Sequence, residues 1–76
     1  MTEHERVVLT TDFPEYGLQT GDVGTIVHVY KEGQAYEVEF VALTGKTVAV
    51  VTVPSDQTRT VQEDEITHAR RMAATG

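Results

Sequence analysis

The chain contains no cysteine, so neither a disulfide nor a thiolate-bound metal supports its fold. No stretch approaches the roughly 18 consecutive apolar residues that a membrane-spanning helix requires. The first six residues are polar and lack the apolar region of a secretory signal. These absences lead us to expect a small cytoplasmic domain that does not associate with membranes.

Basic residues are also scarce. Six Lys and Arg stand against twelve Asp and Glu, giving a net charge of −6 at pH 7 with histidine neutral. Nucleic acids bind proteins chiefly through cationic side chains that release counterions, so this balance makes nucleic acid an unfavourable partner. The negative field either attracts a basic partner or simply keeps the surface solvated.

Patterns for catalysis and metal binding are absent from the sequence. His4, His28 and His68 are far apart, and no two have the spacing of metal ligands. Ser55 is the sole serine, and no histidine lies near it as a base. The glycines do not form a phosphate-binding loop. We therefore expect a chain that is not an enzyme, with no catalytic residue, metal or cofactor.

What the sequence does contain is a series of short segments rich in β-formers, separated by turn-forming residues. This spacing predicts an all-β fold, a small barrel. The third segment alternates most strictly, with Tyr36, Val38 and Phe40 facing inward and Glu37 and Glu39 facing solvent. We expect five strands, at about residues 6–10, 24–30, 35–41, 46–53 and 58–61.

Several apolar residues are left over after this core is assigned. The loop 11–21 is too apolar for a solvated loop, and we expect it to fold back over one end of the barrel. Alternation places Ile26, His28 and Tyr30 on the outer face of the second strand, and Val48 and Val50 on that of the fourth. Either these residues form a partner or homodimer surface, or the C-terminal tail covers them.

The tail, residues 62–76, differs in character from the barrel. Acidic residues precede Ile66 and basic residues follow it, which matches a helix dipole, and the apolar spacing is roughly helical. A helix this short is marginal without docking. We predict that the tail forms a short helix or is disordered, and that the barrel occupies residues 1–61.

Four segments carry a more specific pattern: the loop Thr10–Leu18, the turn Gly21–Val27, the strand Ala35–Phe40 and the segment Ala49–Pro54. Together they resemble a family of short bacterial proteins classed as a domain of unknown function. The resemblance covers about residues 6–61 and implies an SH3-like barrel without an established activity. The turn and third strand are also similar to other SH3-like barrels, including KOW modules, which informs the fold alone.

We therefore interpret the chain as a five-stranded SH3-like barrel that acts as a non-enzymatic protein-interaction module. It would be an acidic accessory, antitoxin-like or stabilising subunit, with another protein of basic character or a second copy as partner. The alternative is a KOW-like nucleic-acid-binding barrel, which would need Arg6, Lys31, Lys46 and Arg59 to cluster. The candidate partner surface comprises Phe13, Tyr16, Leu18, Ile26, His28, Tyr30, Glu37, Glu39, Val48 and Val50.

Overall fold

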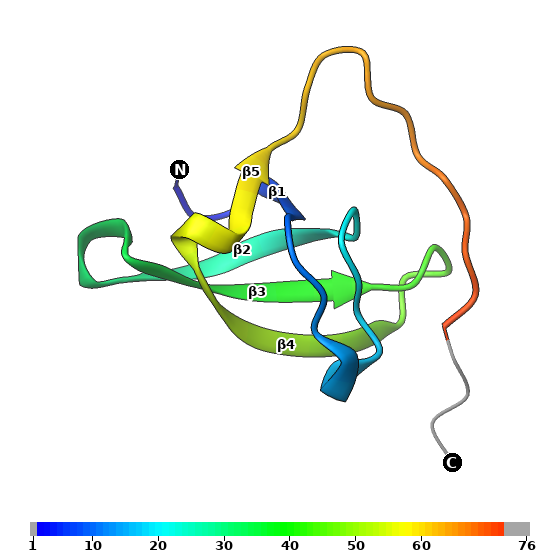
Figure 1. The fold of residues 1–76 in the computed structure, drawn as a ribbon, viewed down its shortest axis with the longest axis horizontal. Coiled ribbons are helices and arrows are strands. Elements are labelled where there is room, and N and C mark those ends of the chain that lie inside the picture. Colours follow the sequence, from blue (N-terminus) through cyan, green and yellow to red (C-terminus); the bar gives the residue numbers. More distant parts are fainter. Residues whose placement is uncertain (1, 73–76) are drawn as a thin grey trace.

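The computed structural model describes residues 2–72, which form one antiparallel sheet of five strands in the order β4-β3-β2-β1-β5 (Figure 1). The all-β prediction is confirmed, and the sheet is strongly curled but not closed into a full barrel. Single 3₁₀ turns, η1 (Pro14–Tyr16), η2 (Lys31–Gly33) and η3 (Ser55–Gln57), link the strands. The strands are β1 (Arg6–Leu9), β2 (Val23–Tyr30), β3 (Ala35–Val41), β4 (Thr47–Pro54) and β5 (Thr58–Thr60).

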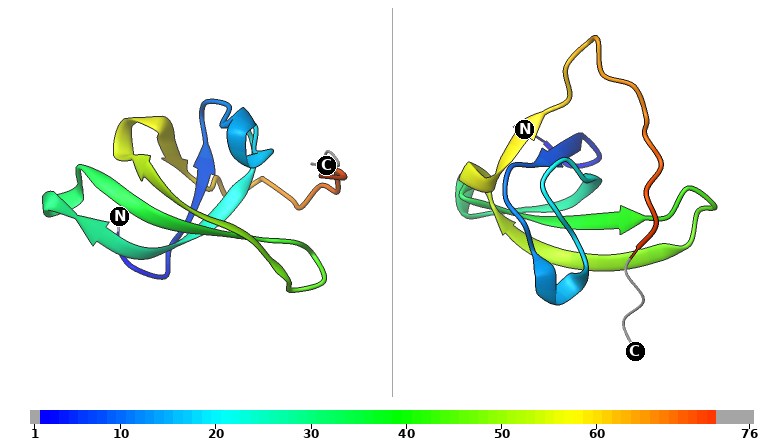
Figure 2. Two further views of the ribbon diagram at one scale, coloured as in Figure 1. Left: turned by 90° about the horizontal axis from the view of Figure 1, so that it is seen from below. Right: turned by 45° about the vertical axis from the view of Figure 1, so that its right-hand side comes forward.

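The core lies between two layers of the curled sheet. Figure 2 shows β2, β3 and β4 on one side, and β1, β5 and η1 on the other. Tyr36, Val38 and Phe40 all point into this space and are at most 5% exposed, as their alternation predicts. They pack with the buried residues Val7, Leu9, Leu18, Ile26, Val51 and Val53. The inward face of β3 therefore anchors the fold through burial of apolar surface.

The segment between β1 and β2 folds back over one end of the core, as predicted, and we call residues 11–20 the hook. Phe13 and Leu18 pair across it through two backbone hydrogen bonds of 2.9 and 3.1 Å. Gly17 closes the turn with φ of 72°, a conformation that glycine adopts without steric cost. Leu18 is only 4% exposed. The prediction that it belongs to a partner surface is therefore wrong, because the hook directs it into the core.

A β-bulge in β2 changes which side chains face inward. Ile26 pairs with Val38 and His28 pairs with Glu37, so Val27 is an extra residue on β2. An extra residue reverses the alternation beyond it. Ile26 consequently faces inward and is fully buried, and the prediction that it lies on the outer face is wrong. His28 and Tyr30, beyond the bulge, remain on the outer face as predicted.

A second irregularity lies between β3 and β4. Phe40 pairs with Ala49 but Val41 pairs with Thr47, which leaves Val48 as an extra residue.

At the same end of the sheet, β3 approaches β2 closely at Gly24. A Cβ atom there would overlap Val38 and lie 2.9 Å from Phe40 Cε1. Only glycine fits under these two core side chains.

The described part of the tail, Gln62–Met72, contains no helix. It runs as an extended arch that leaves β5 and returns to the hook (Figure 1). The prediction of a short helix is wrong for these residues, and Ala73 and the rest of that prediction lie outside the described residues. Arg70 fixes the far end of the arch, because its guanidinium donates hydrogen bonds to the Asp22 carboxylate and to the Gly17 carbonyl (3.0 Å).

Candidate functional site

The most organised polar surface lies on the side of β2, β3 and β4 that faces away from the core, which we call the outer face. Its side chains come from alternate positions on three neighbouring strands, so the strand register decides which of them meet. Glu37 of β3 lies opposite His28 of β2 and Thr52 of β4. Glu39 lies opposite Thr25 and Val50. The two carboxylates therefore form a central row, flanked by hydroxyl, imidazole and valine side chains.

Glu37 is held from both sides by hydroxyl groups. The Tyr30 phenol donates a hydrogen bond of 2.7 Å to Oε2, and the Thr52 hydroxyl donates one of 2.9 Å to Oε1. The bond to Glu37 raises the pKa of the Tyr30 phenol, with smaller contributions from its burial and from the carboxylate charge. A carboxylate bonded through both oxygens has little freedom to reorient, so Glu37 presents its charge in a defined direction.

Glu39 is positioned in the same way by one hydroxyl, since Thr47 Oγ1 donates to Oε2 at 2.8 Å. The ion pairs among residues 2–72 join His28 to Glu3, Arg59 to Glu65 and Arg70 to Asp22. None of them involves either of these two strand glutamates. The row therefore carries two negative charges that the described chain orients but does not neutralise.

His28 lies at the margin of this row. Its ring packs edge-on against Tyr30, with ring centroids 4.4 Å apart and planes at 71°. Its Nδ1 lies 3.7 Å from a Glu3 carboxylate oxygen, and both side chains are about half exposed. The N-terminal segment thus brings a third carboxylate to the edge of the outer face.

The predicted partner-surface residues separate into three groups in the structure. His28, Tyr30, Glu37, Glu39 and Val50 come together on the outer face, and Val50 is 51% exposed. Phe13 and Tyr16 lie on the hook, in the opposite layer, where Phe13 packs against the core and Tyr16 is 43% exposed. Leu18 and Ile26 are buried, as described above. Val48 is 37% exposed at the β4 bulge.

Sequence reasoning missed the threonines of β4. Thr47 and Thr52 were assigned no role, although they position the two glutamates. A hydroxyl residue on a strand adjacent to an acidic one is the signal that could have found them. It becomes readable only when the β3–β4 register is known, because a shift of one residue would move both threonines to the other face.

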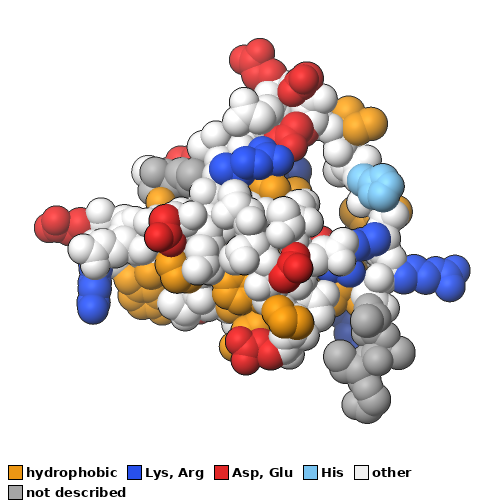
Figure 3. Space-filling model, in the orientation of Figure 1, with side chains coloured by type: hydrophobic (Ala, Val, Ile, Leu, Met, Phe, Trp, Pro, Cys, Tyr) orange, Lys and Arg blue, Asp and Glu red, His pale blue; other side chains and the backbone are white. Residues whose placement is uncertain are grey.

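A hollow lies beneath the arch of the tail, and Figure 3 shows the opening between the arch and the body. Its wall includes Val23, Val41, Leu43 and Val48 from the sheet. Val8, which is 2% exposed but lies outside the core cluster, also lines it. Ile66 of the arch is 91% exposed and does not fill this space.

The start of the arch, which follows β5, is held by a charged contact. Arg59 donates two hydrogen bonds, of 2.8 and 2.7 Å, to the carboxylate of Glu65. These bonds and the one from the Gln62 backbone N–H lower the pKa of Glu65 to about 2. The arch is thus held at both ends, by Arg59 of β5 and by the contacts of Arg70 with Asp22 and the hook.

Two further structural observations bear on function. Within residues 2–72, no group of three or more His, Asp or Glu side chains converges in a way that could hold a metal ion. No helix in this part of the chain has the length and apolar character needed to cross a bilayer.

Comparison with known proteins gives one match. The profile of a family described as "Domain of unknown function (DUF4926)" matches residues 3–60, which include all five strands and exclude the arch of the tail. No curated protein and no solved structure matches the chain significantly.

Proposed function

The chain belongs to this family of unknown function, and we propose that it is a cytoplasmic, non-enzymatic interaction module whose outer face binds a basic segment of another protein. One observation carries the proposal: Glu37 and Glu39 are oriented by hydroxyl groups yet pair with no cation among residues 2–72. A partner that supplies Lys or Arg would complete these bonds, and charge-assisted hydrogen bonds are the stronger kind.

The spacing of the row indicates what kind of segment fits it. Glu37 and Glu39 are two positions apart on one strand, so their carboxylates project about 7 Å from each other. An extended segment repeats its side chains on one face at the same interval. The matching partner therefore carries Lys or Arg at positions i and i+2 of an extended stretch.

The surroundings of the row also suit a protein partner. Val50 lies directly opposite Glu39 and is half exposed, so a partner that covers the carboxylate also covers apolar surface. Protein interfaces combine apolar contact with polar contacts at their edges. The chain's net charge of −6 would further accelerate association with a basic partner.

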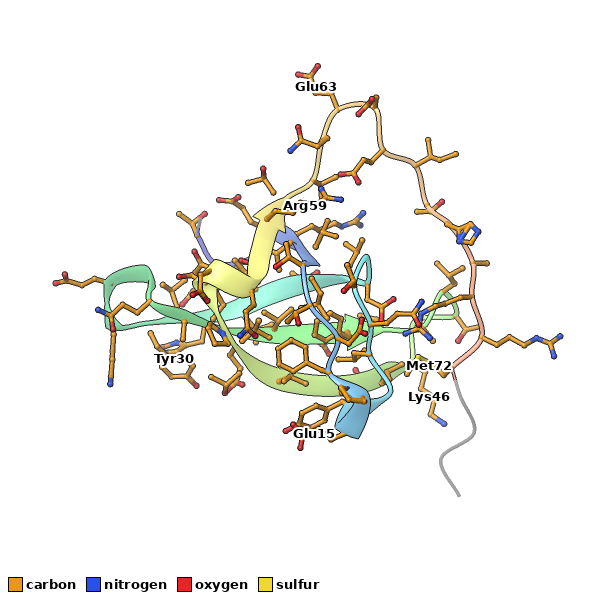
Figure 4. All side chains as sticks on the ribbon, in the orientation of Figure 1. Glu15, Tyr30, Lys46, Arg59, Glu63 and Met72 are labelled. Carbon is orange, nitrogen blue, oxygen red and sulfur yellow. The ribbon has the colours of Figure 1, made fainter. Side chains whose placement is uncertain are left out.

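Nucleic-acid binding receives less support, because the basic residues are dispersed. Lys31 precedes β3 and Lys46 follows it, and a seven-residue strand separates its two ends by roughly 20 Å. Arg59 is paired with Glu65. Figure 4 places Lys46 and Arg59 well apart, and Figure 3 shows Lys and Arg at separate places on the visible face.

The proposal can be tested with a short peptide in which lysine and threonine alternate. We expect calorimetry in low salt to detect binding that weakens at about 0.15 M salt, as screening predicts. The double variant Glu37→Gln/Glu39→Gln should lose this binding. The matched variant Glu15→Gln/Glu63→Gln removes the same charge from exposed positions on the hook and on the arch and should retain it (Figure 4).

Two controls separate a specific site from general acidity. A peptide of the same composition with its lysines adjacent should bind more weakly, because only one lysine at a time can reach the row. Capture of natural partners with the wild type and both double variants as baits should then show a protein that the Glu37→Gln/Glu39→Gln bait loses. Equal binding by all three baits would contradict the proposal, as would a shift of RNA mobility by the wild type without any peptide binding.

A further inference from the structure

The outer edge of β4 is the longest free sheet edge in the described chain. Strand β4 has eight residues and pairs with β3 alone, whereas β5 at the opposite end of the sheet has three residues and carries Arg59. A strand at a sheet edge presents one row of unpaired backbone amides and carbonyls.

The hydrogen-bonding pattern of the β3–β4 ladder identifies which backbone groups of β4 face away from β3. The Ser55 amide donates to the Gln34 carbonyl at 3.0 Å, which places this pair in a hydrogen-bonded position. In an antiparallel ladder such positions alternate, so Val51 and Val53 direct their backbone groups toward β3. Val50 and Thr52 direct theirs away from it. Outside the ladders, no hydrogen bond among residues 2–72 uses the backbone of either residue.

This edge lacks the features that normally prevent strands from associating. Natural edge strands carry charged residues, prolines or bulges that block pairing. From Ala49 to Val53, β4 has no charge and no proline, and four of its five residues are β-branched. The bulge at Val48 and the proline at position 54 lie on either side of this stretch. Figure 2 shows η1 in the layer across the core from β4, so the hook does not pair with the edge.

We propose that a second copy of this chain pairs with β4 in antiparallel orientation, with the two-fold axis at Val51. This register places Val50 opposite Thr52 of the second copy and Thr52 opposite Val50 of the second copy. Each pair exchanges two backbone hydrogen bonds, so all outward groups of Val50 and Thr52 become satisfied. A two-fold interface requires such a self-complementary surface.

Charge favours a second copy over the basic segment proposed for the outer face. The edge itself is neutral and offers no carboxylate to a cation. In the dimer, the glutamate rows of the two β3 strands are three strand spacings apart, about 14 Å. The Debye length at physiological salt is about 8 Å, so their repulsion is largely screened. Dimerisation leaves the outer face open, and its test is therefore independent of the proposed function.

The test is backbone amide exchange by NMR over a range of protein concentrations. The amides of Val50 and Thr52 should exchange rapidly in dilute solution and more slowly as concentration rises. Those of Val51 and Val53 already bond to β3 and serve as internal controls that do not change. Sedimentation under the same conditions should show a monomer–dimer equilibrium.

A matched pair of variants identifies the surface. Val50→Lys should weaken dimerisation by about tenfold, because it replaces valine in both Val50–Thr52 cross-strand pairs and places like charges near the axis. Val27→Lys adds the same charge at an exposed position of an internal strand and should leave dimerisation unchanged. A monomer at all concentrations, a dimer insensitive to Val50→Lys, or protection of Val50 and Thr52 only by a different protein would overturn the proposal.

Discussion

The phenol of Tyr30 donates a 2.7 Å hydrogen bond to the carboxylate of Glu37, joining the last residue of β2 to the centre of β3. The contact links the hairpin end of the sheet to the acidic row. It depends on the bulge at Val27, which moves Tyr30 to the face that Glu37 occupies. One irregular residue in β2 therefore determines the composition of the outer face.

In the Tyr30→Phe variant, the stability of the protein should fall less steeply as the pH rises into the alkaline range. The hydrogen bond to Glu37 raises the folded-state pKa of Tyr30 above its usual value of 10.0. A raised pKa contributes stability that is fully present below the unfolded pKa and is lost as pH rises through the folded pKa. Urea unfolding between about pH 8 and pH 11 should show a steeper loss in the wild type than in the variant.

The matched control for this change is Tyr16→Phe. Tyr16 is exposed on the hook, and its hydroxyl bonds to no described residue. This variant should follow the wild-type pH dependence. If both variants flattened the alkaline loss equally, the Tyr30–Glu37 bond would not be its cause.

Gly24→Ala should destabilise the fold by about 1–3 kcal/mol, the usual cost of overpacking a core. The added Cβ would overlap Val38 and lie 2.9 Å from Phe40 Cε1, so β2 and β3 would have to separate. Gly45→Ala is the control, because its φ of 96° strains an alanine while nothing lies within 4 Å. The backbone strain alone should cost about 1 kcal/mol. Equal losses in denaturant unfolding would show that steric contact at Gly24 is unimportant.

The parts of the fold that could be predicted from sequence are those governed by regular alternation. In β3, apolar and acidic residues alternate without interruption from Tyr36 to Phe40. The inward positions of Tyr36, Val38 and Phe40 were therefore predicted correctly. Alternation failed at Ile26 because no residue type marks the bulge after it. The local sequence contains no glycine or proline there, and the extra residue is set by pairing with β3.

The acidic row could be predicted only in part. Glu37 and Glu39 were expected on one face, which two-residue spacing requires. Their hydroxyl partners come from other strands, so they depended on a register that a single sequence does not reveal. The tail was harder still, since the contact of Arg70 with Asp22 joins residues 48 positions apart. Local helical spacing could not anticipate this long-range ion pair.

Arg70→Ala should release the far end of the arch without unfolding the barrel. It removes the bonds to Asp22 and to the Gly17 carbonyl. Local segments with few buried contacts open independently of the core. Cleavage within Gln62–Met72 by a protease that does not require arginine should accelerate by about three- to tenfold, with the unfolding midpoint nearly unchanged.

Arg71→Ala is the matched control for the arch, because the exposed Arg71 side chain forms no ion pair with residues 2–72. Its cleavage rate should equal that of the wild type. Faster cleavage of both variants to the same degree would mean that total positive charge, rather than the Asp22 contact, holds the arch.

The contact between Arg59 and Glu65 at the start of the arch should persist in acid to an unusually low pH. Hydrogen bonds from Arg59, and secondarily from the Gln62 amide, lower the pKa of Glu65 from 4.5 to about 2. A lowered pKa contributes stability that is present above the unfolded pKa and is lost as pH falls through the folded pKa. The stabilising contact should therefore weaken progressively from about pH 4.5 down to about pH 2. A carboxyl carbon NMR titration should give a Glu65 midpoint near the lower value. In Arg59→Gln the largest of these interactions is removed, so the midpoint should rise toward 4.5, whereas Arg71→Gln should leave it in place. An unchanged midpoint in Arg59→Gln would show that the Gln62 amide alone holds this carboxylate.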